Sequence, residues 1–172
     1  MGVNEVALGL TLSIAALTDW REQKIYNKLL IPAFLFALVI HTFQSGLSGF
    51  TSSLMGAFIG FVLLLLPYIL GGMGAGDVKL LAVIGAFGGS SFVLTSFLYG
   101  AIIGGLISVL LLARRKVLGN ALKDIMLIYP LLQKRLISSE VINDDRHEKF
   151  PYGIAIVLGT LALLLTSGGV VP

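Results

Sequence analysis

The longest uncharged run in this chain constrains its fold more than any other feature. Leu80 to Ala113 contains thirty-four residues without a single Asp, Glu, Lys or Arg. A helix that spans a bilayer needs about 20 mainly apolar residues, so this run is long enough for more than one crossing. Across the 172 residues, 56% of the side chains are hydrophobic and 12% are charged, outside the range of water-soluble domains. Because backbone groups inside a bilayer need internal hydrogen-bond partners, the expected fold class is an all-α, polytopic membrane protein.

The apolar runs predict six transmembrane helices in a single membrane-embedded domain that covers residues 1–172. The Gly88-Gly89-Ser90-Ser91 cluster is the predicted turn that divides the longest run into a fourth and a fifth span. Gln44 to Gly49, which has no charge, is the predicted tight turn between the second and third spans. The predicted spans are Val6–Thr18, whose ends draw in Gly2–Glu5 and Asp19-Trp20, then Leu29–Phe43, Phe50–Leu70, the two parts of Leu80–Ala113, and Tyr152 to about Val171. The first span has no basic segment before it and is expected to be retained rather than cleaved as a signal peptide.

Arg114 to Pro151 is the only long hydrophilic region of the sequence, with eight basic and five acidic residues. Its apolar side chains recur at alternating steps of four and three, which places them on one helical face. These side chains are Leu118, Leu122, Ile125, Tyr129, Leu132 and Leu136. The pattern predicts an interfacial amphipathic segment between the fifth and sixth spans, kinked at Pro130. A cytoplasmic helix packed on its own loop explains the same pattern equally well.

The twelve Lys and Arg residues indicate the orientation of the chain. They lie in three places: the loop after the first span, the segment just before the fourth, and the loop after the fifth. Six spans put these three places on one side, which is then the cytoplasmic side. Both termini are therefore expected outside an inner (cytoplasmic) membrane. Asp19 and Asp77 are expected at cytoplasmic ends of spans, at one depth, whereas Glu5 lies on the opposite side.

The segment Gly71-Gly72-Met73-Gly74-Ala75-Gly76-Asp77-Val78-Lys79 joins four glycines to a carboxylate beside an apolar span. An ionisable group at such a position is a functional-site candidate. Glycines such as Gly74 and Gly76 let another chain lie directly against the backbone, within reach of Asp77. If Asp19 lies nearby, the two carboxylates do not readily both ionise, so one holds a proton while the other is charged. An aspartyl protease needs that arrangement, because one group takes a proton from water while the other polarises the scissile carbonyl.

Other interpretations of the same residues stay open at this point. Asp19 as a helix-end residue balanced by Arg21 or Lys24, and Asp77 as a helix cap near Lys79, would be purely structural. A small carboxylate-dependent proton or cation transporter also uses intramembrane carboxylates. A non-catalytic membrane scaffold protein is a third possibility.

Several classes of site are not supported by the composition. The chain has no Cys, which excludes disulfides, thiolate metal sites and cysteine nucleophiles. His41 and His147 are isolated; His41 is expected at a span end near the interface and His147 in a solvated loop, and no metal site is predicted. The glycine run follows no strand and contains no Gly-Lys-Ser/Thr sequence, so it does not predict a phosphate loop. We therefore expect no cofactor, and no nucleic-acid partner.

Three blocks of the sequence resemble one family, the type IV prepilin peptidases, which are membrane aspartyl proteases. Gly74-Ala75-Gly76-Asp77-Val78-Lys79 resembles the family's Gly-x-Gly-Asp-x-Lys signature. Asp19-x-Arg21, Ile25-x-Asn27 and Pro32 resemble the region around the first catalytic aspartate, and Phe150-Pro151-Tyr152-Gly153-Ile154-Ala155 resembles the closing Pro-Tyr/Phe-Gly segment. A bare Gly-x-Gly-Asp also occurs in presenilin-like proteases, but three blocks in order over nearly the whole chain are far more specific.

The resemblance implies a reaction, a site and a substrate. Asp19 and Asp77 match the catalytic pair, Gly74 and Gly76 would admit the substrate backbone, and Lys79 would orient the loop or a substrate carboxylate. The implied substrate is a prepilin or preflagellin-like protein with a basic leader and a hydrophobic helix in the membrane lipid, cut on the cytoplasmic side after a Gly. The large bifunctional members carry an N-terminal domain with paired cysteines and N-methylate the product. Because no such domain precedes the first span, the chain resembles the short forms that serve Flp-type tight-adherence pili, or preflagellin peptidases, and methylation is not expected.

Overall fold

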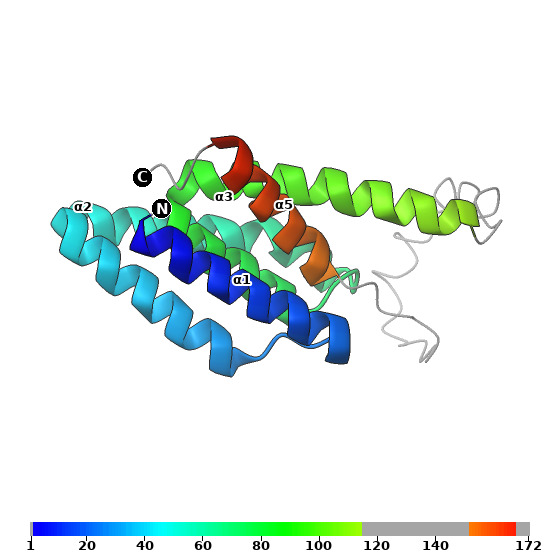
Figure 1. Ribbon diagram of the computed structural model, residues 1–172, viewed down its shortest axis with the longest axis horizontal. Helices are drawn as coiled ribbons and strands as arrows, with labels where there is room; N and C mark the ends of the chain where they lie inside the picture. Colours follow the sequence, from blue (N-terminus) through cyan, green and yellow to red (C-terminus); the bar gives the residue numbers. More distant parts are fainter. Residues whose placement is uncertain (1, 115–151, 168–172) are drawn as a thin grey trace, which may run out of the picture. The chain divides into compact units, whose positions relative to one another are not determined.

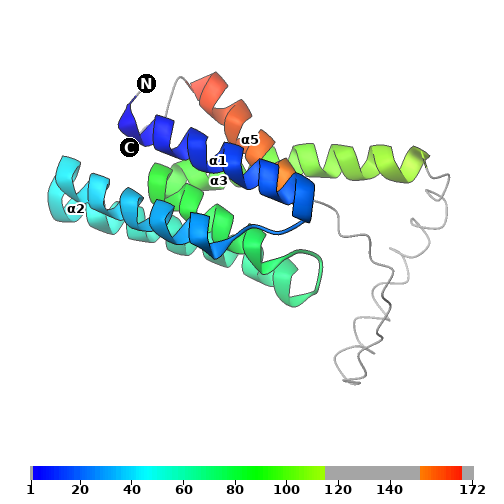
Figure 2. The same ribbon diagram turned by 60° about the horizontal axis from the view of Figure 1, so that its bottom comes forward.

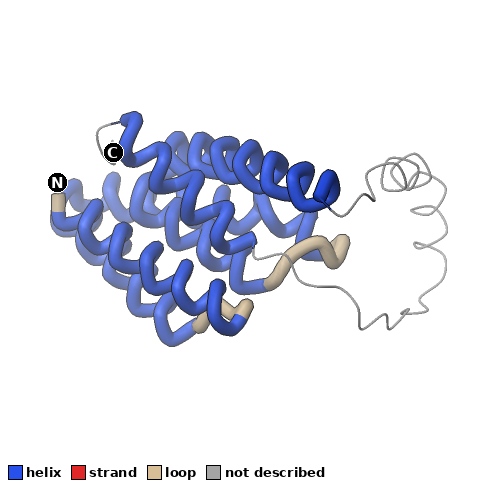
Figure 3. Tube along the Cα trace, turned by 45° about the vertical axis from the view of Figure 1, so that its right-hand side comes forward, coloured by secondary structure: helices blue, strands red, loops and turns tan. Residues whose placement is uncertain are grey.

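The computed structural model describes residues 2–114 and 152–167, and every secondary-structure element within them is an α-helix. The helices are α1 (Val3–Glu22), α2 (Asn27–Ile69), α3 (Ala75–Arg114) and α5 (Tyr152–Ser167), shown in Figure 1 and, as a tube, in Figure 3. The all-helical prediction is therefore confirmed for the described residues. The predicted amphipathic segment at 114–151 and the end of the last predicted span lie outside them.

The chain divides into two compact units, Met1–Gly104 with Lys149–Pro172, and Gly105–Glu148. The first unit holds α1, α2, α5 and α3 as far as Gly104; the described part of the second consists of the last turns of α3. A single domain over residues 1–172 stays a prediction.

Two breaks in the backbone turn the long helices back on themselves. Gly46 has φ 62° and ψ −141° inside α2, and Gly89 has φ 73° and ψ −172° inside α3. Residues with a Cβ rarely adopt this region of φ and ψ, so a helix reverses most readily at glycine. Both breaks fall within the turns that the sequence predicts, at Gln44–Gly49 and Gly88–Ser91. α2 and α3 each consist of two helical arms, and both views of the ribbon show α2 doubling back (Figures 1 and 2).

Two of the described helices, Asn27–Ile69 and Ala75–Leu110, are long and apolar enough to cross a membrane, each with a mean hydropathy of 2.0. The shorter Tyr152–Thr166 is also apolar. Both long helices carry large side chains on their exposed surface, among them Phe58, Leu66, Ile102 and Leu106. This pattern is that of a protein surrounded by lipid rather than by water.

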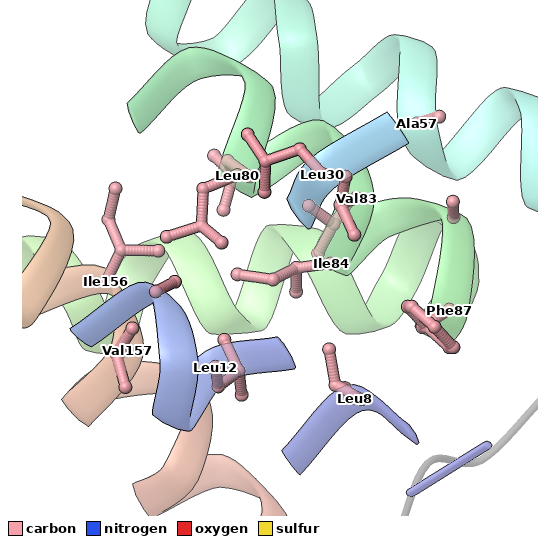
Figure 4. Close-up of a cluster of buried hydrophobic side chains, with 14 of the residues drawn as sticks. Leu8, Leu12, Leu30, Ala57, Leu80, Val83, Ile84, Phe87, Ile156 and Val157 are labelled. Carbon is pink, nitrogen blue, oxygen red and sulfur yellow. The ribbon is translucent and has the colours of Figure 1, made fainter. Parts of the chain in front are cut away.

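The core of the first unit is built by all four helices. Leu8 and Leu12 of α1 and Leu80, Ile84 and Phe87 of α3 are almost fully buried. Figure 4 shows these side chains with Leu30 and Ala57 of α2 and Ile156 and Val157 of α5. Close backbone contacts complete the packing, because Gly56 of α2 lies directly against Gly85 of α3, where a Cβ on either residue would collide with the other's carbonyl oxygen. Small residues at helix contacts serve this purpose in membranes.

His41 lies near the end of the first α2 arm, shortly before the break at Gly46, as predicted for the end of the second span. Its side chain is buried, and its Nε2 lies 2.8 Å from the carbonyl oxygen of Phe87. Ser53 of the other α2 arm donates a hydrogen bond to the neighbouring carbonyl oxygen of Ala86 at 2.7 Å. Both contacts lie just before Gly89, so the two arms of α2 supply hydrogen-bonding groups where α3 leaves helical geometry. The sequence did not indicate the burial of His41, because the turn in α3 that covers it is distant in sequence. Its position near the interface stays a prediction.

Candidate functional site

Asp19 and Asp77 come from different helices and are both buried in the first unit. Asp19 lies in the last turn of α1 and is 5% exposed, while Asp77 lies in the first turn of α3 and is 8% exposed. The two carboxyl groups are near enough to interact electrostatically. Figures 1 and 2 show the end of α1, the start of α5 and the loop between α2 and α3 at the same end of this unit. The structure therefore brings together the two residues that the sequence selected.

The carboxylate of Asp19 lies against the start of α5. The backbone N–H of Ile154 donates a hydrogen bond to it. A Cβ placed on Gly153 would be 2.5 Å from Asp19 Oδ2, so only glycine leaves room for this carboxylate. Asp19 Oδ2 is buried and has no hydrogen-bond partner among the described residues. This oxygen is positioned to accept a hydrogen bond from a group that enters the site.

The carboxylate of Asp77 closes the first turn of its own helix. Its Oδ2 accepts a hydrogen bond of 3.1 Å from the backbone N–H of Gly74, and the Asp77 N–H donates to the Gly74 carbonyl oxygen at 3.2 Å. A negative charge is favoured at this position because the first N–H groups of a helix point toward it. Asp77 thus has the capping contact of the structural interpretation as well as its proximity to Asp19.

The cationic partners of the structural interpretation are not in place. Within residues 2–114 and 152–167, no Lys or Arg side chain forms an ion pair with Asp19 or Asp77. Lys79 Nζ instead donates to Asn27 Oδ1 at 3.0 Å, which ties the first turn of α3 to the start of α2. Lys79 is exposed and is not brought to the carboxylates.

The two glycines before Asp77 differ in their surroundings. Gly74 is exposed, and a Cβ there would lie 3.5 Å from Asp77 Oδ2. Gly76 is partly buried, and a Cβ there would lie 3.0 Å from Cβ of Ile25. The side chain of Ile25 also reaches Gly153, because a Cβ on Gly153 would lie 3.1 Å from Ile25 Cδ1. Ile25 therefore packs between the start of α3, which carries Asp77, and the start of α5, which contacts Asp19.

Three residues of the site, Ile25, Gly153 and Ile154, were not selected from the sequence as site residues. Both segments that contain them belong to the family resemblance. Their presence in the same pattern as Asp19 and Asp77 is the signal that could have identified them as site residues. Within the described residues, no group of three His, Asp or Glu side chains is arranged to hold a metal ion. The arrangement consists of two interacting buried carboxyl groups, which can accept and donate protons.

Comparisons with known proteins place the chain in a family. The pattern of the type IV leader peptidase family matches residues 6–109, a range that contains both Asp19 and Asp77. A protein named prepilin leader peptidase/N-methyltransferase from Pseudomonas putida is 32% identical over 127 residues, which cover 68% of this chain and 44% of that protein. Proteins of the same name from Bacillus subtilis and Stutzerimonas stutzeri are 37% and 31% identical, over 55% and 62% of this chain and 39% and 40% of their own lengths.

The chain thus spans well under half the length of these curated relatives. No solved structure matches it. Because the family pattern covers more than half of the chain, including both buried carboxylates, the chain belongs to the type IV leader peptidase family.

Proposed function

We propose that this protein is a membrane aspartyl endopeptidase that removes the leader peptide of prepilin-like proteins, with Asp19 and Asp77 as its catalytic pair. The observation that supports it best is the meeting of two buried carboxyl groups from α1 and α3. Neither has a cationic partner among the described residues, so neither charge is neutralised by a basic side chain. The family pattern, which includes both residues, supports a peptidase, and the printed names of the relatives supply the class of substrate.

The proposed mechanism uses one proton shared by the pair. The ionised carboxyl takes a proton from a water molecule, whose oxygen attacks the scissile carbonyl carbon. The protonated carboxyl donates a hydrogen bond and then its proton to the carbonyl oxygen. The tetrahedral intermediate then breaks its C–N bond as the protonated carboxyl gives its proton to the amine nitrogen. The other carboxylate takes a hydroxyl proton from the intermediate as the C=O bond of the product carboxyl group forms, so the pair again has one ionised and one protonated group. The pair titrates as a unit, so neither role is assigned permanently to one residue.

The proposed substrate carries a basic leader followed by a hydrophobic helix that lies in the membrane. Gly74 is the better candidate for contact with the substrate backbone, because it is exposed beside Asp77 while Ile25 packs against Gly76. We further propose six membrane crossings in an inner membrane, from α1, the two arms of α2, the two arms of α3, and α5. Both termini then lie outside, and the carboxylates lie near the cytoplasmic face, in agreement with the distribution of Lys and Arg.

The test is co-expression of the chain with a prepilin-like protein, comparing native protein with Asp19→Asn and Asp77→Asn. Asparagine preserves size and hydrogen bonding but cannot exchange a proton, so each variant should leave the pilin at full length by gel mobility and N-terminal sequencing. Glu22→Gln is the matched control, because this exposed carboxylate is only three residues from Asp19. It should cleave at the native rate.

Folding of the variants is monitored by their level in the membrane and their thermal unfolding. A buried carboxylate charge without a cationic partner is costly, so Asp19→Asn, which removes the charge, should be at least as stable as the native protein. Cleavage by either variant would refute the two-carboxylate mechanism. Ion flux from reconstituted vesicles without cleavage would identify a transporter instead. Normal pilus assembly with the Asp77→Asn variant would indicate a non-catalytic role.

A further inference from the structure

The surface formed by the two arms of α2 and the first arm of α3 contains two hollows unrelated to the carboxylates. One has a volume of about 550 Å³ and the other about 300 Å³. Both are lined by Phe34, Phe61 and Ala82, so they form one groove. Neither Asp19 nor Asp77 lines it. We refer to it below as the α2 groove.

The α2 groove exists because small residues lie at its floor. Ala57 and Ala82 line the larger hollow, and a Cβ on Gly60 would collide with the backbone of Leu81. The second α2 arm is therefore pressed against α3. The first arm is held separately, through Leu30 in the core and the hydrogen bond from Lys79 to Asn27. Apolar side chains line the space between the two arms, and Phe58 and Met55 are among those that line the larger hollow.

One end of the α2 groove is polar and cationic. Lys79 and Asn27 line the smaller hollow, and neither residue is buried. Lys79 uses one of its three N–H donors on Asn27 Oδ1, which leaves two donors on Lys79 and the Nδ2 amide group of Asn27 free to bind an acceptor. No carboxylate among the described residues forms an ion pair with Lys79. The exposed Lys28 adds a second positive charge next to Asn27.

We propose that the α2 groove binds one anionic glycerophospholipid. Its phosphate accepts hydrogen bonds from Lys79 Nζ and Asn27 Nδ2, and an acyl chain runs past Phe34 and Phe61 into the larger hollow. Basic pockets between membrane helices bind anionic head groups in this way. The positive charge of Lys79 selects an anionic head group, and the aromatic side chains of the groove exclude water from the acyl chain. Binding does not depend on the proposed peptidase activity.

The polar end of the groove favours a lipid over the hydrophobic helix of a substrate. An anionic head group can accept hydrogen bonds from Lys79 and Asn27, whereas hydrophobic side chains offer no acceptor to these donors. The groove also lies on a face of α3 that carries Lys79 rather than Asp77. A substrate helix seated there would not present its leader to the carboxylates.

Fluorescence quenching by brominated lipids tests the proposal in the full-length protein. The only Trp of the chain, the exposed Trp20, is replaced by Phe, and Phe61→Trp then places a reporter in the groove. The protein is reconstituted in phosphatidylcholine with traces of brominated phosphatidylglycerol or brominated phosphatidylcholine of the same chain length. Phe58→Trp, at a more exposed wall position, provides a second reporter if Phe61→Trp does not fold.

We expect brominated phosphatidylglycerol to quench at about one fifth of the concentration needed for phosphatidylcholine, the ratio that corresponds to about 1 kcal/mol per cationic side chain near the membrane surface. Lys79→Gln should abolish this preference, whereas Lys24→Gln, an exposed lysine that does not line the groove, should keep it. Equal quenching by the two lipids, or an equal loss in both Lys variants, would overturn the proposal. Shielding of the reporter from both lipids on addition of a hydrophobic pilin helix would also overturn it, and would assign the groove to the substrate.

Discussion

Asp19 illustrates how one residue depends on a distant one. Its carboxylate is accommodated only because Gly153 has no Cβ, and the N–H of Ile154 stabilises its charge. α5 therefore contributes to the site although it supplies none of the carboxylates. Gly153 is best described as a positioning residue, which acts through Asp19.

Gly153→Ala should reduce prepilin cleavage by tenfold or more while leaving the protein folded. The added Cβ must displace the Asp19 carboxylate, and a shift of about 1 Å at a catalytic group can cost about 10²-fold in rate. The rate is measured at saturating and at low prepilin concentration, because misplacement of Asp19 should lower kcat more than it raises KM.

Gly159→Ala is the matched control for packing damage. Gly159 is also too close to its neighbours for a Cβ, but its contact is with Gly100 of α3 rather than with Asp19. It should lower thermal stability and membrane level, while the remaining folded protein keeps its kcat. If both variants lose kcat alike, Gly153 has only a packing role.

At the scale of elements, α2 and α3 are each a continuous stretch of chain that a single glycine divides into two helical arms. Beside the reversals at Gly46 and Gly89, Gly56 lies against Gly85, and Asp77 is buried at the other end of the first α3 arm. His41 and Ser53 then hydrogen-bond the carbonyl groups just before Gly89. The turns at Gly46 and Gly89 thus fix how the arms of α2 and α3 pack, although they lie at the opposite end of these arms from the site.

Gly46→Ala and Gly89→Ala should each lower the free energy of unfolding by about 1–3 kcal/mol, because a Cβ is strained at these φ and ψ values. A steric collision does not explain the loss of stability at Gly46, because a Cβ there would meet nothing within 4 Å. Gly9→Ala, in open space inside α1, should instead be neutral or stabilising by up to about 1 kcal/mol. The measurement is unfolding in detergent by denaturant, and equal stability of all three variants would contradict the backbone-strain argument.

At the scale of the molecule, the basic side chains of the described part of the first unit lie at the end that contains the site. Arg21, Lys24, Lys28 and Lys79 lie there, at the end of α1 and the starts of α2 and α3. At the other end of α1, Asn4 donates to Gln44 beside the α2 reversal at 3.1 Å, and no basic residue is nearby in sequence. The exposed Trp20, Tyr26 and Tyr68 flank the charged end, as aromatic residues do at a membrane–water interface.

A topology reporter should distinguish the two ends of the molecule. Fused after Arg115 it should behave as cytoplasmic, and inserted at Gly46 as external, because the basic residues hold their end on the cytoplasmic side. The reverse pattern would place the carboxylates on the outer face and contradict cleavage at the cytoplasmic face. Prepilin cleavage by a chain that carries the reporter as an insertion after Arg115, and so keeps α5, provides the control for correct insertion.

The sequence alone was sufficient for the helices, the two turns and the pair of carboxylates. Long uncharged runs require helices in a bilayer, Gly46 and Gly89 occupy conformations that favour glycine, and Asp19 and Asp77 are charges beside apolar runs. Each of these conclusions depends on local chemistry, which is readable from neighbouring residues.

The tertiary structure decided what surrounds those carboxylates. Lys79 matches the last residue of the Gly-x-Gly-Asp-x-Lys signature, but two residues correspond to about 200° around a helix, and its ammonium donates to Asn27 Oδ1. Its role in orienting the loop or a substrate carboxylate stays a prediction. Gly153, Ile154 and Ile25 reach the site, and His41 reaches Phe87, through contacts between segments far apart in the chain. Such contacts are set by how helices pack, since small residues four apart indicate that a helix can approach another closely but not which segment it meets.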